Sequence, residues 1–304
     1  MDGWNYEPLW QKSKLYIDRA LAENRDNNLF PFWAALALEF LARATLARIH
    51  PALLAEPDCI LHAFGYNAGK PPKSIMAKTL FARCQTVVPH FGQEEVNACM
   101  SVIDRRNEEL HTGNLSFDSF PTAIWLPEYY RVCSLLLSFQ GKNLTDFLGE
   151  DEAEAAGKMI RSAEEQVIGK VQKAIDQKKA EFEGLDADEQ SNRRQLAELA
   201  ATNPTDHSAR VVQCPACEAK AVITGERVSA AEPRIHEGLM HQDVAFLPVS
   251  FLCPSCGLTL SGHAFLHAAK MGGQYSVTET WDPVEYYGEK WLEYLAEDNA
   301  YMNE

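Results

Sequence analysis

The chain has 304 residues, a formal net charge of −15 and 46% hydrophobic residues. This composition fits a soluble globular protein with room for two modest domains, and the negative charge argues against strong nonspecific attraction to nucleic acid. The first ten residues, MDGWNYEPLW, lack the basic start and apolar core of a secretory signal. The longest apolar run, 29–46, is interrupted by Pro31, Glu39 and Arg43, so it suits a buried helix better than a membrane span. We therefore expect a cytoplasmic protein without a membrane partner.

The first half of the chain is predicted to be helical throughout. Apolar residues recur at helical spacing over 8–23, 30–49, 74–86, 93–112 and 127–139. The segment 30–49 is apolar on nearly every face, which predicts a central helix. Inside it Glu39 and Arg43 lie four residues apart and are expected to form an ion pair, with a supporting role at an active site as the alternative. Residues 1–147 are thus predicted to form a helical bundle.

Residues 148–205 differ in composition and are predicted to form a helical connector. They are rich in Ala, Glu, Lys and Gln. A three-four alternation marks a narrow seam along one long helix: Ile160, Ala163, Val167, Val171, Ala174, Lys178 and Phe182. The sequence EGLDADEQ then predicts a turn, followed by a shorter return helix over 193–201. This pattern indicates a coiled-coil-like hairpin or stalk.

Residues 206–304 carry two Cys-x-x-Cys turns among β-branched segments. CPAC supplies Cys214 and Cys217, and CPSC supplies Cys253 and Cys256. Two such turns complete the tetrahedral thiolate shell of a structural Zn²⁺ ion, which predicts a small β-rich zinc ribbon. Four thiolates leave no place for a water molecule, so catalysis by this metal is not expected. An iron site or a redox dithiol is the alternative, and His263 and His267 are rival ligands.

The sequence DRRNEELHTG, residues 104–113, combines cationic and polar groups at a predicted helix end. Arg106 falls on the stripe that Val96, Cys99, Ile103 and Leu110 define as the core face of this helix. A cation at such a position requires a partner, an interface or an anion. Asn107 and His111 are four residues apart and share a helix face. Arg105 is expected to pair with the two following glutamates.

The motif Arg106–Asn107–x3–His111 resembles that of the HEPN family. RNA-cleaving members carry an arginine, a polar residue, a few variable residues and a histidine late in a small helical bundle. The segment AALALEFLARATL also resembles a HEPN helix, and the likeness covers residues 1–147. One departure is Gly113, where HEPN toxins that are paired with a nucleotidyltransferase antitoxin carry a tyrosine.

The resemblance implies a metal-independent endoribonuclease that acts as a homodimer, with two motif copies forming one composite cleft. His111 would act as general base or acid, Arg106 would bind the phosphate, and Asn107 would orient the histidine or hold a phosphate oxygen. Attack by the ribose 2′-OH would give a cyclic 2′,3′-phosphate. Arg105 fits the spacing loosely and, like Glu39, is a supporting candidate. A role as toxin or antiphage effector, under a regulatory protein partner, follows from the same analogy.

The segment from Cys59 to Gln93 has no Asp or Glu and carries the candidate RNA-binding cations Lys70, Lys73, Lys78 and Arg83.

Two other interpretations remain open. The acidic balance favours a non-catalytic alternative, in which a dimeric HEPN scaffold and its zinc ribbon bind RNA or proteins as an adaptor. A third interpretation takes the motif as plain helix surface and the ribbon as a protein-docking module.

Overall fold

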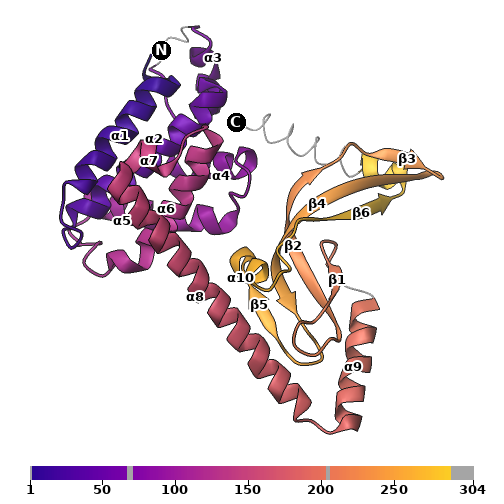
Figure 1. Ribbon diagram of the computed structural model, residues 1–304. Coiled ribbons are helices and arrows are strands. Elements are labelled where there is room, and N and C mark those ends of the chain that lie inside the picture. The colour runs from indigo at the N-terminus through magenta and orange to yellow at the C-terminus, as the bar shows by residue number, and fades with distance from the viewer. Residues whose placement is uncertain (1, 67–70, 203–205, 289–304) are drawn as a thin grey trace. The chain divides into compact units, whose positions relative to one another are not determined.

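The computed structural model describes residues 2–66, 71–202 and 206–288 of the chain (Figure 1). Most of this part is helical, with one antiparallel sheet toward the C-terminus, which confirms a mainly α fold with a small β region. The chain divides into two compact units, Met1–Ala163 and Glu164–Glu304. Their boundary falls within one long helix, so residues of the predicted connector 148–205 contribute to both units.

Unit 1 is a helical bundle built around one apolar helix. Its helices are α1 (Tyr6–Leu21), α2 (Leu29–Ile49), α3 (Ile60–Ala63), α4 (Ala77–Val87), α5 (Gln93–His111), α6 (Thr122–Phe139), α7 (Leu144–Leu148) and the first part of α8 (Glu150–Glu183). Helix α2 packs against α1, α4, α5 and α6, and most of its alanine and leucine side chains are buried among them. In the described chain α2 is also the one helix long and apolar enough to span a membrane, but 61% of that apolar window is buried, as in a core helix.

Two details of unit 1 differ from the sequence prediction. Helix α6 begins at Thr122 rather than at Pro127. Burial of Trp125 and Leu126 stabilises its first turn, and Pro127 removes only one backbone hydrogen bond. Leu110 is 52% exposed, so it does not belong to the core face of α5. The apolar contact of that face ends at Ile103, and the next residue of the stripe, Arg106, meets a carboxylate instead.

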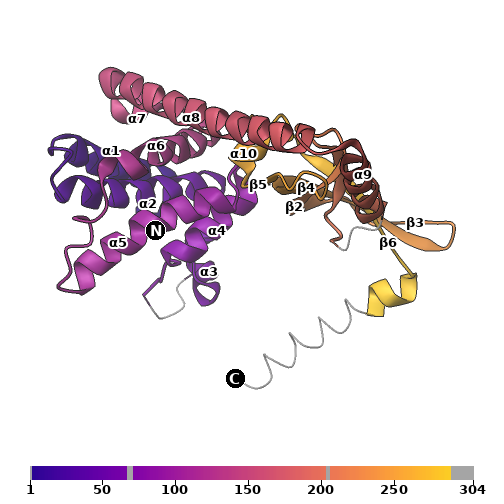
Figure 2. The same cartoon turned by 90° about the horizontal axis from the view of Figure 1, so that it is seen from below.

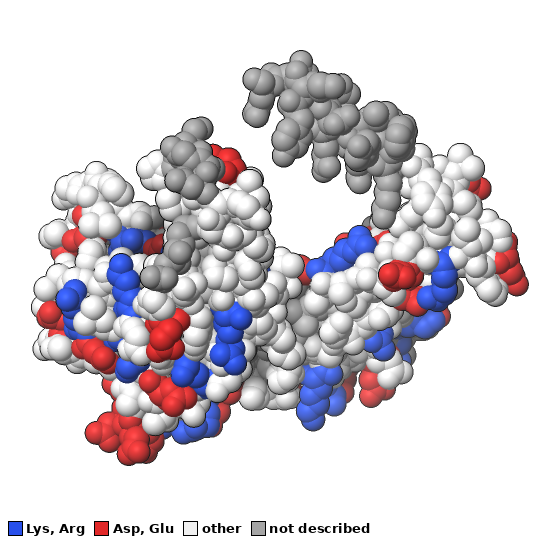
Figure 3. All heavy atoms as spheres, turned by 90° about the horizontal axis from the view of Figure 1, so that it is seen from above, with Lys and Arg blue, Asp and Glu red and all other residues white. Residues whose placement is uncertain are grey.

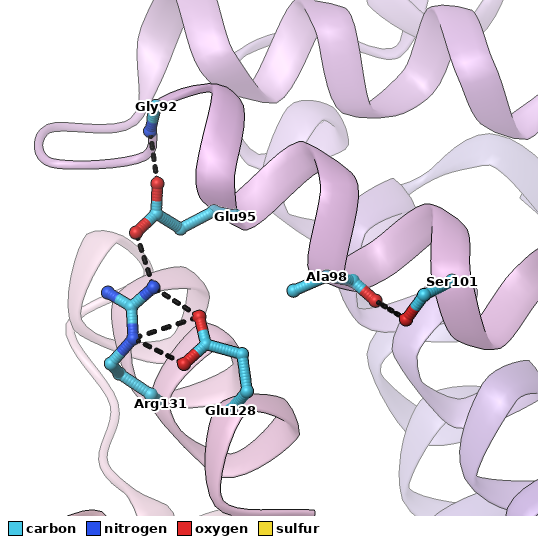
Figure 4. Close-up of polar contacts among 6 residues, drawn as sticks. All are labelled: Gly92, Glu95, Ala98, Ser101, Glu128 and Arg131. Atoms are coloured by element: carbon cyan, nitrogen blue, oxygen red, sulfur yellow. Dashed lines mark hydrogen bonds and ion pairs between the residues drawn. The ribbon is translucent and has the colours of Figure 1, made fainter. Parts of the chain in front are cut away.

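A buried carboxylate fixes the start of α5 against α6 (Figure 4). Glu95 accepts a hydrogen bond of 2.6 Å from the N–H of Gly92, which satisfies one free donor at the helix start. Its other oxygen lies 2.5 Å from the Arg131 guanidinium, which also binds Glu128. Burial opposes the charge of Arg131, yet these two carboxylates raise its pKa. The network sets the position of the helix that ends at His111.

Unit 2 contains the sheet and the remaining helices. Its elements are the second part of α8, α9 (Ala187–Thr202), β1 (Arg210–Gln213), β2 (Lys220–Ala230), β3 (Arg234–His236), β4 (Leu239–Leu252), β5 (Thr259–Ser261), α10 (His263–Ala268) and β6 (Tyr275–Trp281). Strand β4 is central, since it pairs antiparallel with β2 and β3 as well as with β5 and β6. Figure 1 shows β4 next to β2 and β6, and Figure 2 shows the same elements from below. The order β1-β2-β4-β3 forms the main path of the sheet.

The apolar seam of α8 packs into the core of unit 2. Val171 and Phe182 are buried in one cluster with the cysteines and with Phe251 and Leu266, and α9 adds Ala197 to the same cluster. Helix α9 packs on β2. The structure thus has the long helix and the shorter second helix expected from the sequence, but α9 begins at Ala187, inside the segment predicted as a turn, rather than at residue 193. The part of the α8 seam that lies in unit 2 is covered by the sheet domain.

Gly225 marks a close approach between strands β2 and β4 in unit 2. A β-bulge interrupts the β2–β4 register between Thr224 and Gly225. A Cβ atom at Gly225 would lie 2.6 Å from the carbonyl oxygen of Leu247 and 2.9 Å from the Tyr275 hydroxyl. Because the first of these neighbours is backbone, relief requires the strands to separate.

We expect Gly225→Ala to destabilise unit 2 by about 2 kcal/mol, the usual scale of overpacking. Hydrogen–deuterium exchange of the β2 and β4 amides measures this as faster exchange. Gly273→Ala is the matched control, because a Cβ there meets no atom within 4 Å. Equal exchange in the two variants would contradict the strand-contact argument.

Candidate functional site

The two Cys-x-x-Cys turns of unit 2 have the same backbone structure. The N–H of Cys214 donates to the carbonyl of Ala219 (2.9 Å), and the N–H of Glu218 donates back to Cys214 (3.0 Å). The second turn repeats this pattern, with Cys253 in place of Cys214 and Gly257 in place of Glu218. Glu218 and Gly257 both adopt positive φ, 63° and 71°, which lets each chain reverse directly after its second cysteine. Each turn therefore presents both of its sulfurs to one side.

The four sulfurs form one buried cluster that could hold a metal ion. All lie within 4.8 Å of one another, with Cys214 Sγ 3.6 Å from Cys256 Sγ and Cys217 Sγ 3.5 Å from Cys253 Sγ. These separations exceed a disulfide bond and fit a tetrahedral thiolate shell, in which bonds of about 2.3 Å place sulfurs roughly 3.8 Å apart. Hydrogen bonds from Cys253 and Cys256 lower the pKa of the Cys214 thiol.

The two rival histidines do not join this cluster. His263 Nδ1 lies 3.2 Å from the carbonyl oxygen of Pro248 on strand β4. The rings of His263 and His267 are 6.2 Å apart at their centroids, one turn apart on α10. In the described part of the chain, the four cysteines are the only His, Cys, Asp or Glu group with the spacing of a metal site.

The candidate catalytic arginine of unit 1 belongs to an ion network across two helices. Glu39 on α2 binds Arg43 through one carboxylate oxygen at 2.7 Å and binds Arg106 of α5 through the other. The three side chains are 11–13% exposed. Burial alone would raise the pKa of Glu39, but Arg43 and Arg106 outweigh it, so this pKa is lowered. The predicted Glu39–Arg43 pair is therefore present, and Arg106 extends it.

The Arg106 guanidinium is not saturated by this network. Its Nε is buried and has no hydrogen-bond partner in the described chain, whereas Arg43 also donates to the carbonyl of Ile75 at 3.0 Å. Two cations and one carboxylate leave the group with one net positive charge. The i,i+4 spacing of Glu39 and Arg43 is readable in the sequence, but the contact with Arg106 depends on how α2 packs on α5.

Asn107 and His111 lie on the more accessible side of α5. Asn107 is half-buried and His111, the last residue of the helix, is exposed. No hydrogen bond joins either side chain to another group within residues 2–66, 71–202 and 206–288. The structure thus positions Arg106 in a packed network and leaves Asn107 and His111 open to a ligand.

Arg105, Glu108 and Glu109 contact the segment that follows α5. The Arg105 guanidinium lies 3.9 Å from the ring centroid of Phe120, rather than in the ion pair with Glu108 and Glu109 that the sequence predicted. Glu108 accepts from the Asn114 side chain, which is the main cause of the lowered pKa of this carboxyl. Glu109 accepts from the N–H of Ser116 at 2.9 Å. These contacts fix the chain that leaves the motif.

The candidate RNA-binding cations have different environments. Lys73 and Lys78 are exposed, whereas Arg83 donates to the carbonyls of Leu53 (2.6 Å) and Ala55 (3.3 Å) and so supports the fold. Lys70 lies outside the described residues. On the face drawn in Figure 3, basic and acidic side chains are interspersed in each unit, without a continuous basic surface.

Metal removal is expected to unfold the sheet unit selectively. A chelator strong enough to strip the site, or Cys253→Ser, should abolish one equivalent of bound metal and destabilise unit 2, because an ion held by all four cysteines would link the two turns across the core. Elemental analysis and hydrogen exchange of β4 measure both effects.

Cys59→Ser is the matched control for that substitution. Cys59 is a buried cysteine of unit 1 whose sulfur accepts from the N–H of Lys73, a bond that serine retains. Full metal content in Cys253→Ser would contradict the four-cysteine site.

Glu39→Gln should lower the stability of unit 1 at neutral pH by about 3 kcal/mol, because it leaves two packed guanidinium groups without their carboxylate. The folded-state pKa of Glu39 is lowered, so its contribution is complete above the unfolded value of about 4.3 and is lost as pH falls through the folded value. The gap between wild type and variant should therefore shrink below about pH 4. Urea unfolding at neutral and acidic pH measures it.

Glu154→Gln provides the comparison, since this glutamate is exposed and pairs with Lys158 at the surface. Its variant should lie close to wild type at both pH values, as surface pairs usually do. A pH-independent gap for Glu39→Gln would show that the network does not depend on the Glu39 charge.

Comparison with known proteins adds no relative to these observations. No family model, no curated protein and no solved structure matches the chain. The family resemblance of the motif therefore stays an expectation from sequence.

Proposed function

We propose that this protein is a HEPN-like, metal-independent endoribonuclease whose reacting groups are Arg106, Asn107 and His111. The observation that carries the proposal is the state of Arg106. Glu39 orients its guanidinium, yet its Nε has no partner in the described chain and the surrounding ion network keeps one net positive charge. A guanidinium with a free donor suits a phosphate, and a phosphate that used the buried Nε would have to displace part of this packed network.

The helix geometry favours a site made by two chains. Five residues along an α-helix turn through about 500°, so Arg106 and His111 of one chain point roughly 140° apart. One copy of α5 therefore brings its arginine and histidine together poorly. A second copy related by a two-fold axis would supply the missing partner, and the exposed end of α5 is open to such a neighbour. We include a homodimer through unit 1 in the proposal.

The proposed reaction is a transesterification within RNA, in which the phosphate passes from the leaving 5′ oxygen to the ribose 2′ oxygen. His111 accepts the proton of a ribose 2′-OH, and the 2′ oxygen forms a bond to phosphorus as the bond to the leaving 5′ oxygen breaks. That oxygen takes a proton from a second imidazole, which the dimer supplies. Arg106 stabilises the charge that develops on the phosphate, and Asn107 holds a phosphate oxygen or the imidazole. DNA lacks the 2′-OH and would not be cleaved.

For unit 2 we propose that the cysteine cluster holds Zn²⁺ as a structural ion. A four-sulfur shell leaves no open position, so this ion supplies stability rather than chemistry. The ribbon would serve recognition of RNA or of a regulatory protein. A cytoplasmic role as toxin or antiphage effector belongs to the proposal by family analogy alone.

The competing function is a non-catalytic HEPN and zinc-ribbon adaptor. One observation favours it, namely the formal net charge of −15, because a free ribonuclease gains from attraction to its polyanionic substrate. Under this alternative the chain would bind RNA or a protein without breaking a bond.

We expect His111→Ala to reduce cleavage of labelled RNA by about 10²–10⁴-fold, the usual contribution of a general acid or base. The assay contains EDTA at a concentration that removes free divalent ions but leaves the bound metal in place, as elemental analysis verifies. Product analysis should give a cyclic 2′,3′-phosphate.

His90→Asn is the control, since it removes another exposed imidazole of unit 1 at a residue with φ of 62°, a conformation that asparagine tolerates. It should cleave like wild type. Equal cleavage by His111→Ala would refute the site assignment, and RNA binding without cleavage by wild type would favour the adaptor.

A further inference from the structure

A cluster of half-buried aromatic rings lies between α1 and α2 in unit 1. We call it the aromatic patch and define it by Tyr16, Trp33 and Phe40 with the flanking cations Lys12 and Arg19. The rings of Tyr16 and Trp33 are 5.7 Å apart and inclined by 16°, so they stack almost in parallel. Phe40 lies 5.5 Å from Tyr16 on the other side. The three rings form a continuous strip about 10 Å long, because Trp33 and Phe40 are two helical turns apart.

The two cations lie over these rings and are exposed. Lys12 Nζ is 4.5 Å from the centroid of Phe40, and the Arg19 guanidinium is 5.0 Å from that of Trp33. Neither cation forms an ion pair in the described chain, although both helices carry acidic residues. The patch therefore combines accessible ring surface with two positive charges that no carboxylate neutralises.

The patch adjoins the Arg106 network on helix α2. Glu39, which binds Arg106, directly precedes Phe40 on α2. The residues of α2 that are neither fully buried nor fully exposed between Phe32 and Arg43 form one strip that passes from the patch to the network: Phe32, Trp33, Leu36, Glu39, Phe40 and Arg43. The patch and the network therefore occupy neighbouring positions on α2.

We propose that the aromatic patch binds the bases of single-stranded RNA on one side of the candidate cleavage site. This inference rests on the proposed function, since it extends the substrate site around Arg106. Bases stack on the aromatic rings, and Lys12 and Arg19 turn from the rings to the adjoining phosphates. Flexible cations over aromatic rings are the side chains that single-strand binding uses, because every base has a π face and every linkage has a charge.

The charge of the patch favours RNA over a second copy of the chain. In a two-fold contact through this surface, each patch would meet itself and bring Lys12 and Arg19 of one chain against those of the other. Such a like-charge contact opposes association, whereas phosphates complement it.

The test uses a short 2′-O-methyl RNA, which cannot be cleaved by 2′-OH attack, and an abasic oligomer with the same number of phosphates. Wild type should bind the base-bearing probe more tightly than the abasic one. Trp33→Leu should weaken binding of the base-bearing probe about tenfold and leave the abasic probe unchanged. The double variant Lys12→Gln/Arg19→Gln should weaken both probes and reduce the salt dependence of binding.

Tyr66→Leu is the matched control, because it removes an aromatic side chain of unit 1 that is 67% exposed and lies outside the patch. Thermal unfolding verifies that each variant is folded, and the charge variant tests the patch even if Trp33→Leu does not fold. Equal binding of both probes by wild type, an equal loss of both in Trp33→Leu, or a shift of the oligomeric state in either variant would overturn the proposal.

The outcome is separable from that of the nuclease proposal. The nuclease proposal is tested by the loss of RNA cleavage in His111→Ala, and the stacking proposal by binding of the uncleavable 2′-O-methyl and abasic probes to the patch variants. If wild type cleaves no RNA but Trp33→Leu still loses base-dependent binding, the nuclease fails and the stacking site stands. If cleavage depends on His111 but the patch variants bind both probes like wild type, the nuclease proposal stands and the stacking site fails.

Discussion

One carboxylate shared between two guanidinium groups organises the candidate site of unit 1. Glu39 lies on the central helix and joins Arg43 of its own helix to Arg106 of α5. Removing the Glu39 carboxylate should lower the stability of unit 1 by more than its ion pairs contribute, because it leaves two guanidinium groups unpaired. The same contact fixes the orientation of Arg106, so stability and the proposed phosphate contact depend on a single side chain. The charge excess of the three groups is what an anion would neutralise.

Unit 2 depends on a different constraint. Its sheet offers a small core, in which the four cysteines lie among Phe251, Leu258 and Leu266, and the seam of α8 completes the cover. Small cores bury too little apolar area to offset chain entropy comfortably, and a metal ion held by the two turns would supply the missing cross-link. The close approach at Gly225 shows that strands β2 and β4 also pack to contact distance.

The sequence allowed prediction of the features that depend on local spacing. Helices α1, α2, α4, α5 and α6, a turn after the long helix α8, and the Cys-x-x-Cys pairs follow from periodicity and motif spacing, and the structure contains them. The short helices α3 and α7 were not predicted. Features that depend on packing were missed or misplaced. The contact of Arg106 with Glu39 joins residues 67 positions apart, and Leu110 has the periodicity of a core residue but lies past the contact between α5 and the bundle.

The acidic composition and an RNA site are compatible because charge acts locally in salt solution. At physiological ionic strength the screening length is about 8 Å, so carboxylates farther than this from a bound phosphate oppose it weakly. The Arg43–Glu39–Arg106 group itself carries one net positive charge, and the acidic residues Asp104, Glu108 and Glu109 close to it on α5 offset that charge. Stacking on Tyr16, Trp33 and Phe40 adds an attraction that salt does not screen. A site of this composition would bind RNA by short-range contacts and would not attract it over long distances. Association with RNA would therefore be slow and would favour strands with unpaired bases.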